Sequence, residues 1–488
     1  MTAHLARRAA DVDVRVPVPD DPTVSFSISF GVGSQDDPPG KEGLAYLTGL
    51  MLAEAGTKRR SYEQILEELY PLASDYSVRV DKERTTMTGR KHRDNLDRYV
   101  PLLIDAYLEP AFDARDFERL KSDAINDIEN TLRYAEDEEL AKAALYAFVF
   151  AGTRYAHPPE GTVRGLENVT LDDVRAFYRA HYTRDNVWIG VGGGFDEALC
   201  ARLAATRDAL PQRAAGSSDP PKIEPRPISR NEVLLIDKPG ADASISLGFP
   251  IDVRRGDADY YALALAVSWL GEHRQASGRL FQVIREIRGL NYGDYAYIEA
   301  FPEGGDRQMP PVNVPRRHQI FEIWIRTLPN EQAHFALRAA ARELDRLVRD
   351  GMRREDFELT RAFLSKYVLH YAETTARRLG YAMDDRFYGL EGEGHLERFR
   401  RMMETVTLDD VNDALARHLA DRRFKIAIVT GDAAGLRAAL ASGAPSPIEY
   451  PNEKPRDVLE EDREIASYPL PIDADAIDVL PVTRAFED

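Results

Sequence analysis

The side chains that could support metal chemistry or hydrolysis are few and scattered in this sequence. Its 488 residues include ten histidines and one cysteine, Cys200. Two histidines four positions apart on a helix lie on one face, where they can share a tetrahedral metal ion. None of the ten histidines stands in an HxxEH or HExxH pattern. A lone cysteine can form neither an intrachain disulfide nor a thiolate cluster. The sequence therefore predicts no metal site of its own.

Other residues of chemical interest have plainer interpretations. His273 is adjacent to Glu272, but neighbouring residues do not converge on one metal, so we interpret His273 as a polar loop residue. The run Gly192–Gly194 follows a strand pattern without the lysine and serine of a phosphate loop, which favours a tight turn. No GxSxG nucleophile elbow is present.

The elements that would position these residues begin with a strand over Val24–Val32, where apolar and polar residues alternate. Apolar residues at helical spacing follow, and Ser61 stands at the N-cap position of a predicted helix. The expected helices of this first part span 43–54, 61–70, 93–107, 113–148 and 171–181, and the expected further strands span 76–80, 84–89 and 187–191.

The second part of the chain repeats this order. Expected strands span 243–249, 292–299, 319–327 and 425–429, and expected helices span 260–270, 279–287, 331–349 and 354–373. The sequence Asp-Phe-Glu occurs at 116–118 and 356–358, and Val-Thr-Leu-Asp-Asp occurs at 169–173 and 406–410. Because two independent segments recur at nearly equal offsets, the sequence indicates a duplication. We predict an α+β fold of two homologous halves, each a mainly antiparallel sheet packed with helices.

The predicted domains are 1–209 and 230–442. They are joined by a proline-, glycine- and serine-rich linker over 210–229. We expect the tail, 443–488, to pack on the surface.

Charge and hydropathy bound the partners and the compartment. The net charge of −18 argues against nucleic acid as a partner. The most apolar run, Tyr261–Gly271, is too short for a membrane span. The N-terminal residues are basic, but no apolar stretch of a secretory signal follows them. The expected location is cytoplasmic, or periplasmic if a signal peptide preceded the sequence.

Several motifs, in their order and spacing, resemble the pitrilysin/insulinase (inverzincin) family of metallopeptidases, in particular its processing-peptidase-like members. The resemblance covers roughly residues 15–435. The segments that carry it are Val32–Asp36, Gly43–Ala45, Gly56-Thr57, His157-Pro158, Gly161-Thr162 and 171–191.

The family's zinc site is HxxEH on one helix, followed 77 residues after the second histidine by a glutamate. In this sequence the corresponding positions are Tyr46, Gly49, Leu50 and Asp127. Leucine cannot bind zinc, and one aspartate cannot hold a catalytic metal. The resemblance therefore implies a degenerate zinc site, with no metal and no catalytic residue on this chain.

A second family motif, R-x6-Y, is present as Arg285 and Tyr292. In the family these side chains hold the substrate backbone near a zinc site in the opposite half or in another subunit. Arginine offers a rigid fork of donors, and a tyrosine hydroxyl can donate to a developing oxyanion. An arginine near a helix end and a tyrosine on the next strand are common in proteins, but the repeat context favours substrate binding. Two tyrosines within 293–297 are expected to pack, and the loop 301–317 either rims a chamber or is a hairpin excursion.

The resemblance implies a non-catalytic, substrate-binding subunit of a heteromeric zinc metallopeptidase. A homologous HxxEH partner would then supply zinc and the general base, and a peptide would bind along a sheet edge. Two alternatives stay open: a structural subunit of a larger complex, as inactive relatives serve in respiratory-chain core proteins, and a stand-alone peptide-binding protein. An active hydrolase with an unrecognised site is the last alternative.

Overall fold

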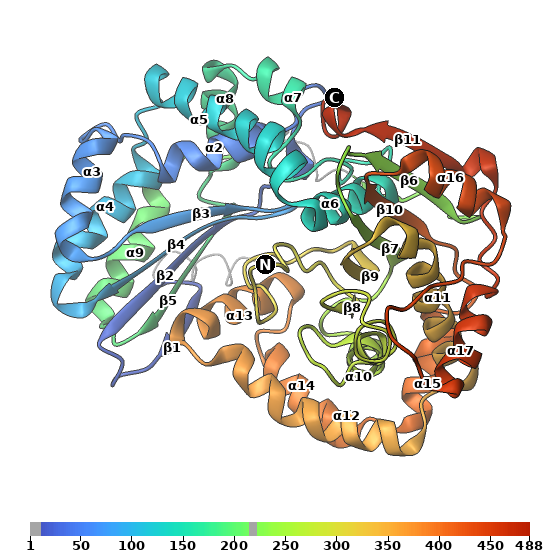
Figure 1. Ribbon diagram of the computed structural model, residues 1–488. Helices are drawn as coiled ribbons and strands as arrows, with labels where there is room; N and C mark the ends of the chain where they lie inside the picture. Colours follow the sequence, from blue (N-terminus) through green and yellow to red (C-terminus); the bar gives the residue numbers. More distant parts are fainter. Residues whose placement is uncertain (1–10, 214–221) are drawn as a thin grey trace.

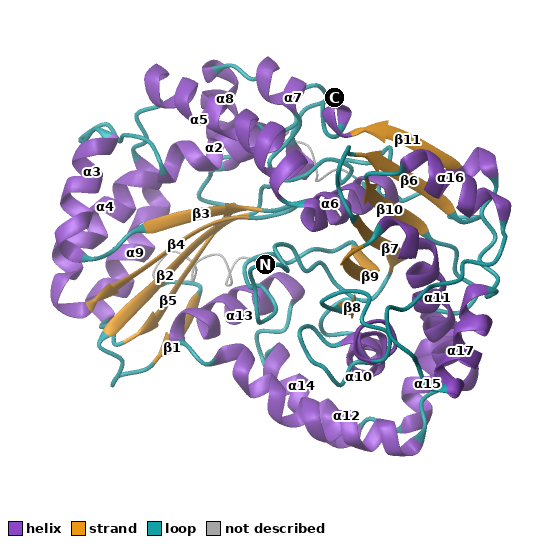
Figure 2. Ribbon diagram, in the orientation of Figure 1, coloured by secondary structure: helices purple, strands orange, loops and turns teal. Residues whose placement is uncertain are grey.

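The computed structural model describes residues 11–213 and 222–488, and this part of the chain folds into two sheets with helices packed against both (Figures 1 and 2). The first sheet has the order β1-β5-β2-β4-β3 and the second β11-β6-β10-β7-β9-β8. Neighbouring strands are antiparallel, except that β1 runs parallel to β5, and β6 runs parallel to both β10 and β11. The predicted α+β class is confirmed.

The strands are β1 Val14–Pro17, β2 Thr23–Phe30, β3 Tyr76–Val80, β4 Thr85–His92, β5 Val187–Gly193, β6 Glu232–Asp237, β7 Ala243–Ile251, β8 Asp294–Tyr297, β9 Gln319–Leu328, β10 Lys425–Thr430 and β11 Ile477–Pro481. The helices up to the linker are α2 Leu44–Ala53, α3 Tyr62–Leu69, α4 Leu96–Leu108, α5 Ala114–Asn126, the π-helix η4 Asp127–Ala135, α6 Asp137–Val149, α7 Val163–Asn168, α8 Leu171–His181 and α9 Glu197–Ala209. Those after it are α10 Ala258–Gly271, the π-helix η5 Phe281–Glu286, α11 Ala333–Asp350, α12 Arg354–Tyr367, α13 Thr375–Tyr388, α14 His395–Thr405, α15 Leu408–His418, α16 Ala433–Ser442 and α17 Arg456–Ala466.

The duplication seen in the sequence is repeated in local structure. Helix α8 begins after Thr170, whose backbone N–H donates to an Asp173 oxygen at 2.9 Å, and α15 begins after Thr407, which makes the same bond to Asp410 at 2.9 Å. In both cases the threonine hydroxyl accepts from the aspartate backbone N–H in return. This capping box satisfies two N–H groups that a helix start leaves unpaired. The repeated pentad thus starts equivalent helices, each followed by a central strand, β5 or β10.

The two halves exchange one helix each. Helix α6, from the first half, packs on β7 and β10 of the second sheet, and α13, from the second half, packs on β1, β2 and β5 of the first (Figure 1). The glycines of β5 permit the close approach of α13, because a Cβ at Gly190 would meet Met383 Sδ at 2.7 Å. Apolar side chains of α6, including Leu140 and Leu145, share a buried cluster with Ile236 and Val429 of the second sheet. Each half therefore completes the core of the other.

The tail after residue 443 belongs to the second half and also reaches the first. It forms α17, which packs on α11, and β11, which extends the second sheet next to β6. Beyond β11, the buried Arg133 of η4 donates to the carbonyl of Ala485 at 2.8 Å and pairs with Glu487 at 2.7 Å. The tail thus contributes a strand in addition to covering the surface.

Three local expectations need correction. The helix expected over 113–148 is interrupted at Glu136, whose φ of −130° and ψ of 66° are not helical, so that η4 and α6 are separate elements. Gly192 and Gly193, expected in a tight turn, pair with β1 and β2 as the end of β5. His273 does lie in a loop, but it is buried, and its ring nitrogens contact the Tyr297 hydroxyl at 2.7 Å and the Arg307 carbonyl at 2.8 Å. Of the predicted linker 210–229, residues 214–221 lie outside the described part of the chain, as do residues 1–10.

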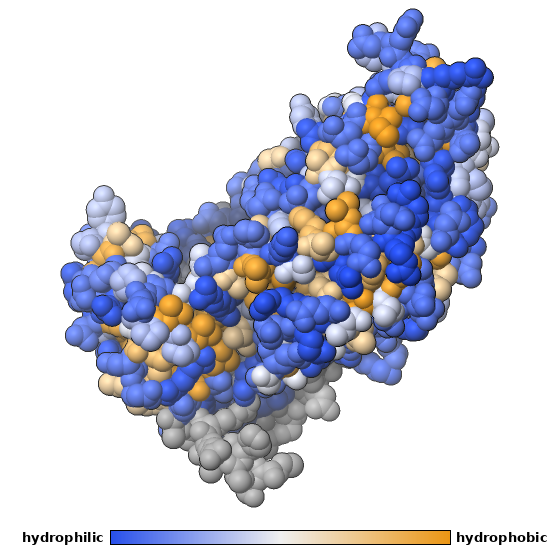
Figure 3. Space-filling model, turned by 90° about the horizontal axis from the view of Figure 1, so that it is seen from below, coloured by the Kyte–Doolittle hydropathy of each residue, from blue (hydrophilic) through white to orange (hydrophobic). Residues whose placement is uncertain are grey.

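Polar side chains cover most of the surface visible in Figure 3. The face seen from below is mostly hydrophilic, with apolar patches separated by polar side chains (Figure 3). Within residues 11–213 and 222–488, no helix combines the length and apolar character required to cross a membrane.

Candidate functional site

Helix α2 carries three of the four positions that correspond to the family's zinc motif. Its start is fixed by Asp37, whose buried carboxylate accepts from the backbone N–H groups of Gly43 at 2.8 Å and Ala45 at 2.7 Å. Gly43 has a φ of +110°, a conformation that favours glycine. These contacts direct α2 against β3 and α8.

The α2 side chains do not suit a zinc ion. Leu50 is buried in the apolar core of the first half and offers no ligand atom. A Cβ placed on Gly49 would lie 2.6 Å from Val80 Cγ2, so this position has no room for a general-base carboxylate without movement of β3. Throughout the described residues, no three His, Cys, Asp or Glu side chains are grouped so that they could hold a metal. The residues present therefore do not fit the family's metal.

The two remaining positions face a common cavity. Asp127 begins η4, and both Asp127 and Tyr46 line a cavity of about 660 Å³ between the halves. Burial raises the pKa of the Tyr46 phenol, and the nearby charges of Glu160 and Asp127 raise it further. The spacing of 77 residues counted in the sequence thus brings Asp127 to the cavity that Tyr46 lines. Gly49 and Leu50 are not among its lining residues.

Both halves line this cavity. The first half contributes the inner edge strand β3, η4, part of α6 and residues 157–160, and the second half contributes residues 300–303 together with Arg307, Val312, Asn313, Arg316 and Arg377. Of the two alternatives for the loop 301–317, a chamber rim agrees better with this placement than a hairpin excursion. Among the described strands, β3 pairs with β4 alone, so within this part of the chain its other edge is free for an extended peptide.

Buried ion pairs fix the two halves to each other at the cavity. The Arg316 guanidinium donates from Nε to Asp81 at 2.7 Å, and both side chains are almost fully buried. The Arg317 backbone N–H donates to Glu83 at 2.6 Å, and the Arg317 guanidinium pairs with the same carboxylate. Because removing one partner would leave a buried charge uncompensated, these contacts resist separation of the halves.

Lys82 and His157 form a buried polar group in the same wall. The Lys82 ammonium donates to the His157 carbonyl. Burial, helped by the neighbouring Arg316 charge, lowers the pKa of Lys82 to about 7. Burial and the Lys82 charge lower the pKa of His157 to about 3, so its imidazole is neutral at ordinary pH. Neither side chain was singled out from the sequence for a chemical role, since no spacing rule connects them.

Arg285 and Tyr292 lie side by side on the second half. Arg285 lies in the last turn of η5, and its guanidinium carbon is 4.6 Å from the centroid of Phe281 and 5.9 Å from that of Tyr292. The Tyr292 side chain is 75% exposed, which is unusual for a large aromatic group. Tyr292 lies just before the start of β8, where the Arg326 backbone N–H donates to the Gly293 carbonyl at 3.1 Å.

This pair is outside the lining of the large cavity, and its neighbour on β9, Arg326, contacts the acidic start of α6. The Arg326 guanidinium donates to Glu138 at 3.0 Å, and Glu138 lines a smaller cavity that shares Glu136, Glu139 and Glu303 with the large one. The two tyrosines within 293–297 are buried in an aromatic cluster with Phe281, Phe301 and Trp324, which confirms their predicted packing role. The structure thus brings Arg285 and Tyr292 together, and separately brings Tyr46 and Asp127 together.

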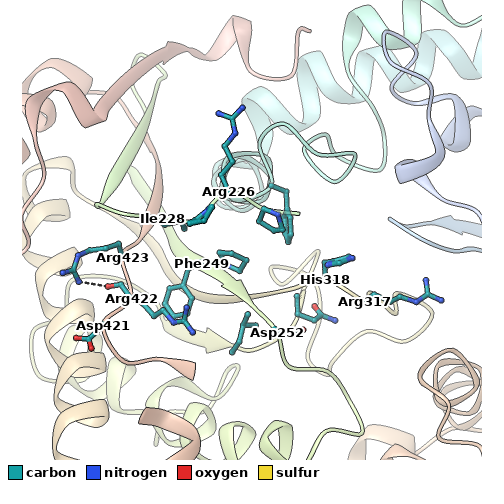
Figure 4. A pocket seen from close by; sticks show the side chains of 15 residues that line it. Arg226, Ile228, Phe249, Asp252, Arg317, His318, Asp421, Arg422 and Arg423 are labelled. Atoms are coloured by element: carbon teal, nitrogen blue, oxygen red, sulfur yellow. Dashed lines mark hydrogen bonds between the residues drawn. The ribbon is translucent and has the colours of Figure 1, made fainter. Parts of the chain in front are cut away.

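A second cavity, of about 490 Å³, lies at the far end of α6, near the start of β10. Arginines are prominent among its lining residues, but Arg226, Arg317 and Arg423 point in different directions away from Phe249 (Figure 4). Cations that diverge in this way do not form one anion-binding centre.

Comparison with known sequences agrees with this architecture. The profile described as Insulinase (Peptidase family M16) matches residues 16–162, and the profile described as Peptidase M16 inactive domain matches residues 168–364. Together the two matches span more than half of the chain. The chain belongs to peptidase family M16.

Relatives and solved structures support the assignment across the whole fold. A Mycobacterium tuberculosis protein described as an uncharacterized zinc protease is 24% identical over 409 residues, covering 83% of this chain and 88% of the relative. The crystal structure of a peptidase M16 inactive domain from Pseudomonas fluorescens has a TM-score of 0.72 at 23% identity, covering 85% of this chain and 94% of that one. A chain of complex III2 from Candida albicans has a TM-score of 0.68 at 15% identity, covering 86% and 94%. The structural likenesses show that the fold is shared over most of the chain.

Proposed function

We propose that this M16 chain is the non-catalytic, substrate-binding subunit of a heteromeric zinc metallopeptidase. In this assignment a homologous HxxEH subunit supplies zinc and the general base. This chain supplies Arg285 and Tyr292, which bind the peptide backbone beside the partner's site. Arg285 donates to a peptide carbonyl, and the Tyr292 hydroxyl donates to the oxyanion that develops during attack, a contribution of about 3 kcal/mol for comparable donors.

The observation that carries the proposal is the contrast between two places in the same molecule. The α2 positions cannot accommodate a metal site, since Leu50 is buried and Gly49 lies against Val80. Arg285 and Tyr292, in contrast, keep polar groups available, and Tyr292 is largely exposed. An exposed tyrosine beside an arginine that lacks a carboxylate partner among the described residues fits a contact surface for a peptide and a second subunit.

The construction of the chain also supports a second subunit. The exchanged helices and the buried pair Asp81–Arg316 oppose opening between the two halves. A peptide chamber that opens and closes is therefore better formed between this chain and another. The free edge of β3 would pair with the peptide as an added strand, with main-chain hydrogen bonds independent of its sequence.

The test is reconstitution with an HxxEH homologue from the same genome, using fluorescein-labelled β-casein as an unfolded substrate. We expect cleavage and bound zinc only in the pair. Tyr292→Phe should lower kcat by roughly 100-fold, and Arg285→Ala should raise KM, because each removes a substrate contact. Tyr70→Phe, which alters a tyrosine that is 87% exposed on η2 Tyr70–Leu72, is the matched control and should leave cleavage unchanged.

Two results would overturn the proposal. Normal cleavage by a pair that carries both Arg285→Ala and Tyr292→Phe would exclude the substrate contact. Metal-dependent cleavage by the pure chain would show an independent active site. If instead the native chain copurifies with a non-peptidase complex and tolerates both substitutions, a structural subunit is the better assignment, and the fold shared with a chain of complex III2 supports that second candidate.

A further inference from the structure

A buried carboxylate lies directly behind the arginine and tyrosine pair. Asp294 is the first residue of β8, and its side chain is fully buried. Its Oδ1 accepts from the Asn291 amide at 2.7 Å, but its Oδ2 has no hydrogen-bond partner. A buried carboxylate oxygen without a donor is costly, so such an atom calls for a functional explanation.

Two arginines act electrostatically on this carboxylate, Arg285 from η5 and Arg326 from β9. Arg326 is already engaged, because its Nε donates to both oxygens of Glu138 at 3.0 and 3.1 Å. Arg285 makes no salt bridge to any described carboxylate and rests against the Phe281 ring. Of the two arginines, Arg285 is therefore the one available to pair with Asp294.

The turn between them holds the two residues close. The Gly289 backbone N–H donates to the Arg285 carbonyl at 2.6 Å, and the Leu290 N–H donates to the Ile284 carbonyl at 3.2 Å. Gly289 has a φ of +72°, which a residue with a side chain rarely adopts. The chain thus reverses tightly after η5 and returns with Tyr292 and Asp294 on the same side as Arg285.

We propose that Asp294 is the positioning residue for Arg285: its free Oδ2 accepts from the guanidinium when a peptide is bound, and this fixes the arginine for contact with the peptide backbone. The inference rests on the proposed function of Arg285. One edge of the planar guanidinium pairs with Asp294, and the remaining donors face the peptide. Fixing the arginine in advance reduces the side-chain entropy that binding would otherwise cost.

The protonation of Asp294 provides an independent readout of its pairing with Arg285. Burial raises the pKa of Asp294 well above its usual range, while Asn291, Arg285 and Arg326 act in the opposite direction. Tyr295, the next residue on β8, also interacts with this charge. Pairing with Arg285 favours the ionised form, so peptide binding should release a proton from Asp294. The affinity should therefore rise with pH as long as the free carboxyl is protonated.

The experiment uses the full chain paired with an HxxEH homologue whose glutamate is changed to glutamine, which prevents cleavage. Binding of fluorescein-labelled β-casein is measured by fluorescence anisotropy from about pH 6 to about pH 9. Asp294→Asn should weaken binding about tenfold and flatten the pH profile. Its melting temperature should be unchanged or higher, because the substitution removes a buried ionisable group and keeps an acceptor for Asn291.

The matched control is Glu322→Gln, which alters another fully buried carboxylate without hydrogen-bond partners, on β9. It should leave peptide affinity and its pH profile unchanged. In the Arg285→Ala background, Asp294→Asn should have no further effect, because the carboxylate acts through the arginine.

The outcomes separate the two proposals. If Arg285→Ala and Tyr292→Phe leave binding unchanged, the substrate-binding role itself is wrong. If Arg285→Ala weakens binding but Asp294→Asn does not, or if the two effects simply add, the positioning role alone is refuted. A tenfold loss that vanishes in the Arg285→Ala background supports it.

Discussion

Substitution of Gly49 tests whether α2 has lost the room for a zinc site. Replacing a glycine by alanine inside a helix ordinarily stabilises it by about 1 kcal/mol. Here the new Cβ would lie 2.6 Å from Val80 Cγ2 and 3.4 Å from Val78 Cγ2, and the helix cannot withdraw because Leu47 and Met51 are fully buried beside it. Valine has a stiff χ1, so its methyl cannot turn aside freely. Overpacking of this kind costs about 1–3 kcal/mol.

We therefore expect Gly49→Ala to lower the free energy of unfolding in urea by about 1 kcal/mol, the overpacking cost exceeding the helix gain. The cause can be isolated with Val80→Ala, which removes the opposing methyl groups. If the contact is responsible, Gly49→Ala should stabilise the Val80→Ala protein by up to about 1 kcal/mol, so the two substitutions should be strongly non-additive.

Gly49→Glu extends the test to the family's own residue. This substitution buries a carboxylate in addition to overpacking the contact with Val80, so the free energy of unfolding should fall by about 3 kcal/mol or more. A protein with histidines at 46 and 50 and glutamates at 49 and 127 should accordingly bind no zinc in equilibrium dialysis while folded. The reasoning is refuted if Gly49→Ala stabilises the native protein, or if the fourfold variant folds and binds one zinc ion.

Three further outcomes are expected from the contacts around the cavity. Asp81→Asn should lower the free energy of unfolding in urea by about 3–5 kcal/mol, because it leaves Arg316 buried without its partner. Arg316 also lowers the pKa of Asp81, so the stabilisation by this pair should be lost as the pH falls below the usual aspartate range. Lys82 is charged in the unfolded protein but has a pKa of about 7 in the folded protein, so the free energy of unfolding should rise between about pH 7 and pH 10 by up to about 4 kcal/mol. Lys82→Met should abolish this rise, and the same dependence of stability on pH in the variant would contradict the role of Lys82. Arg133→Ala should speed hydrogen exchange in η4 by about tenfold or more, since it removes the bonds to Ala485 and Glu487, whereas exposed Arg456→Ala should not.

Sequence reasoning succeeded where the determinants are local or follow a fixed spacing. The pentad that begins with Val169 predicted a helix start, and the structure shows the capping box at Thr170 and its copy at Thr407. The count of 77 residues placed Asp127 at the cavity that Tyr46 lines. The helix starts depend on hydrogen bonds within one turn, and the position of Asp127 follows a fixed residue count, so both can be read from the sequence.

The features that sequence reasoning missed depend on tertiary contacts. Glu136 is an ordinary helix former, yet the chain breaks there so that α6 can cross to the second sheet. Asp294 stands at the start of a strand of buried tyrosines, and only the structure shows that one of its oxygens has no partner. An isolated charge at a strand end was the available signal, but such residues usually face water.

The exchange of α6 and α13 decides how a peptide can enter. Each sheet has one face covered by helices of its own half and the other by the helix from the opposite half. Opening the two halves would strip α6 from β7 and β10 and expose the apolar cluster around Leu140 and Leu145. At about 25 cal/mol per Å² of apolar surface, exposing a helix face of several hundred Å² costs of the order of 10 kcal/mol, which is comparable to the stability of a whole domain. Separating the two halves of the chain would thus cost nearly as much free energy as unfolding a domain. A peptide therefore has to reach the free edge of β3 without separation of the halves, and exposed Tyr292 remains available for contact with a second subunit.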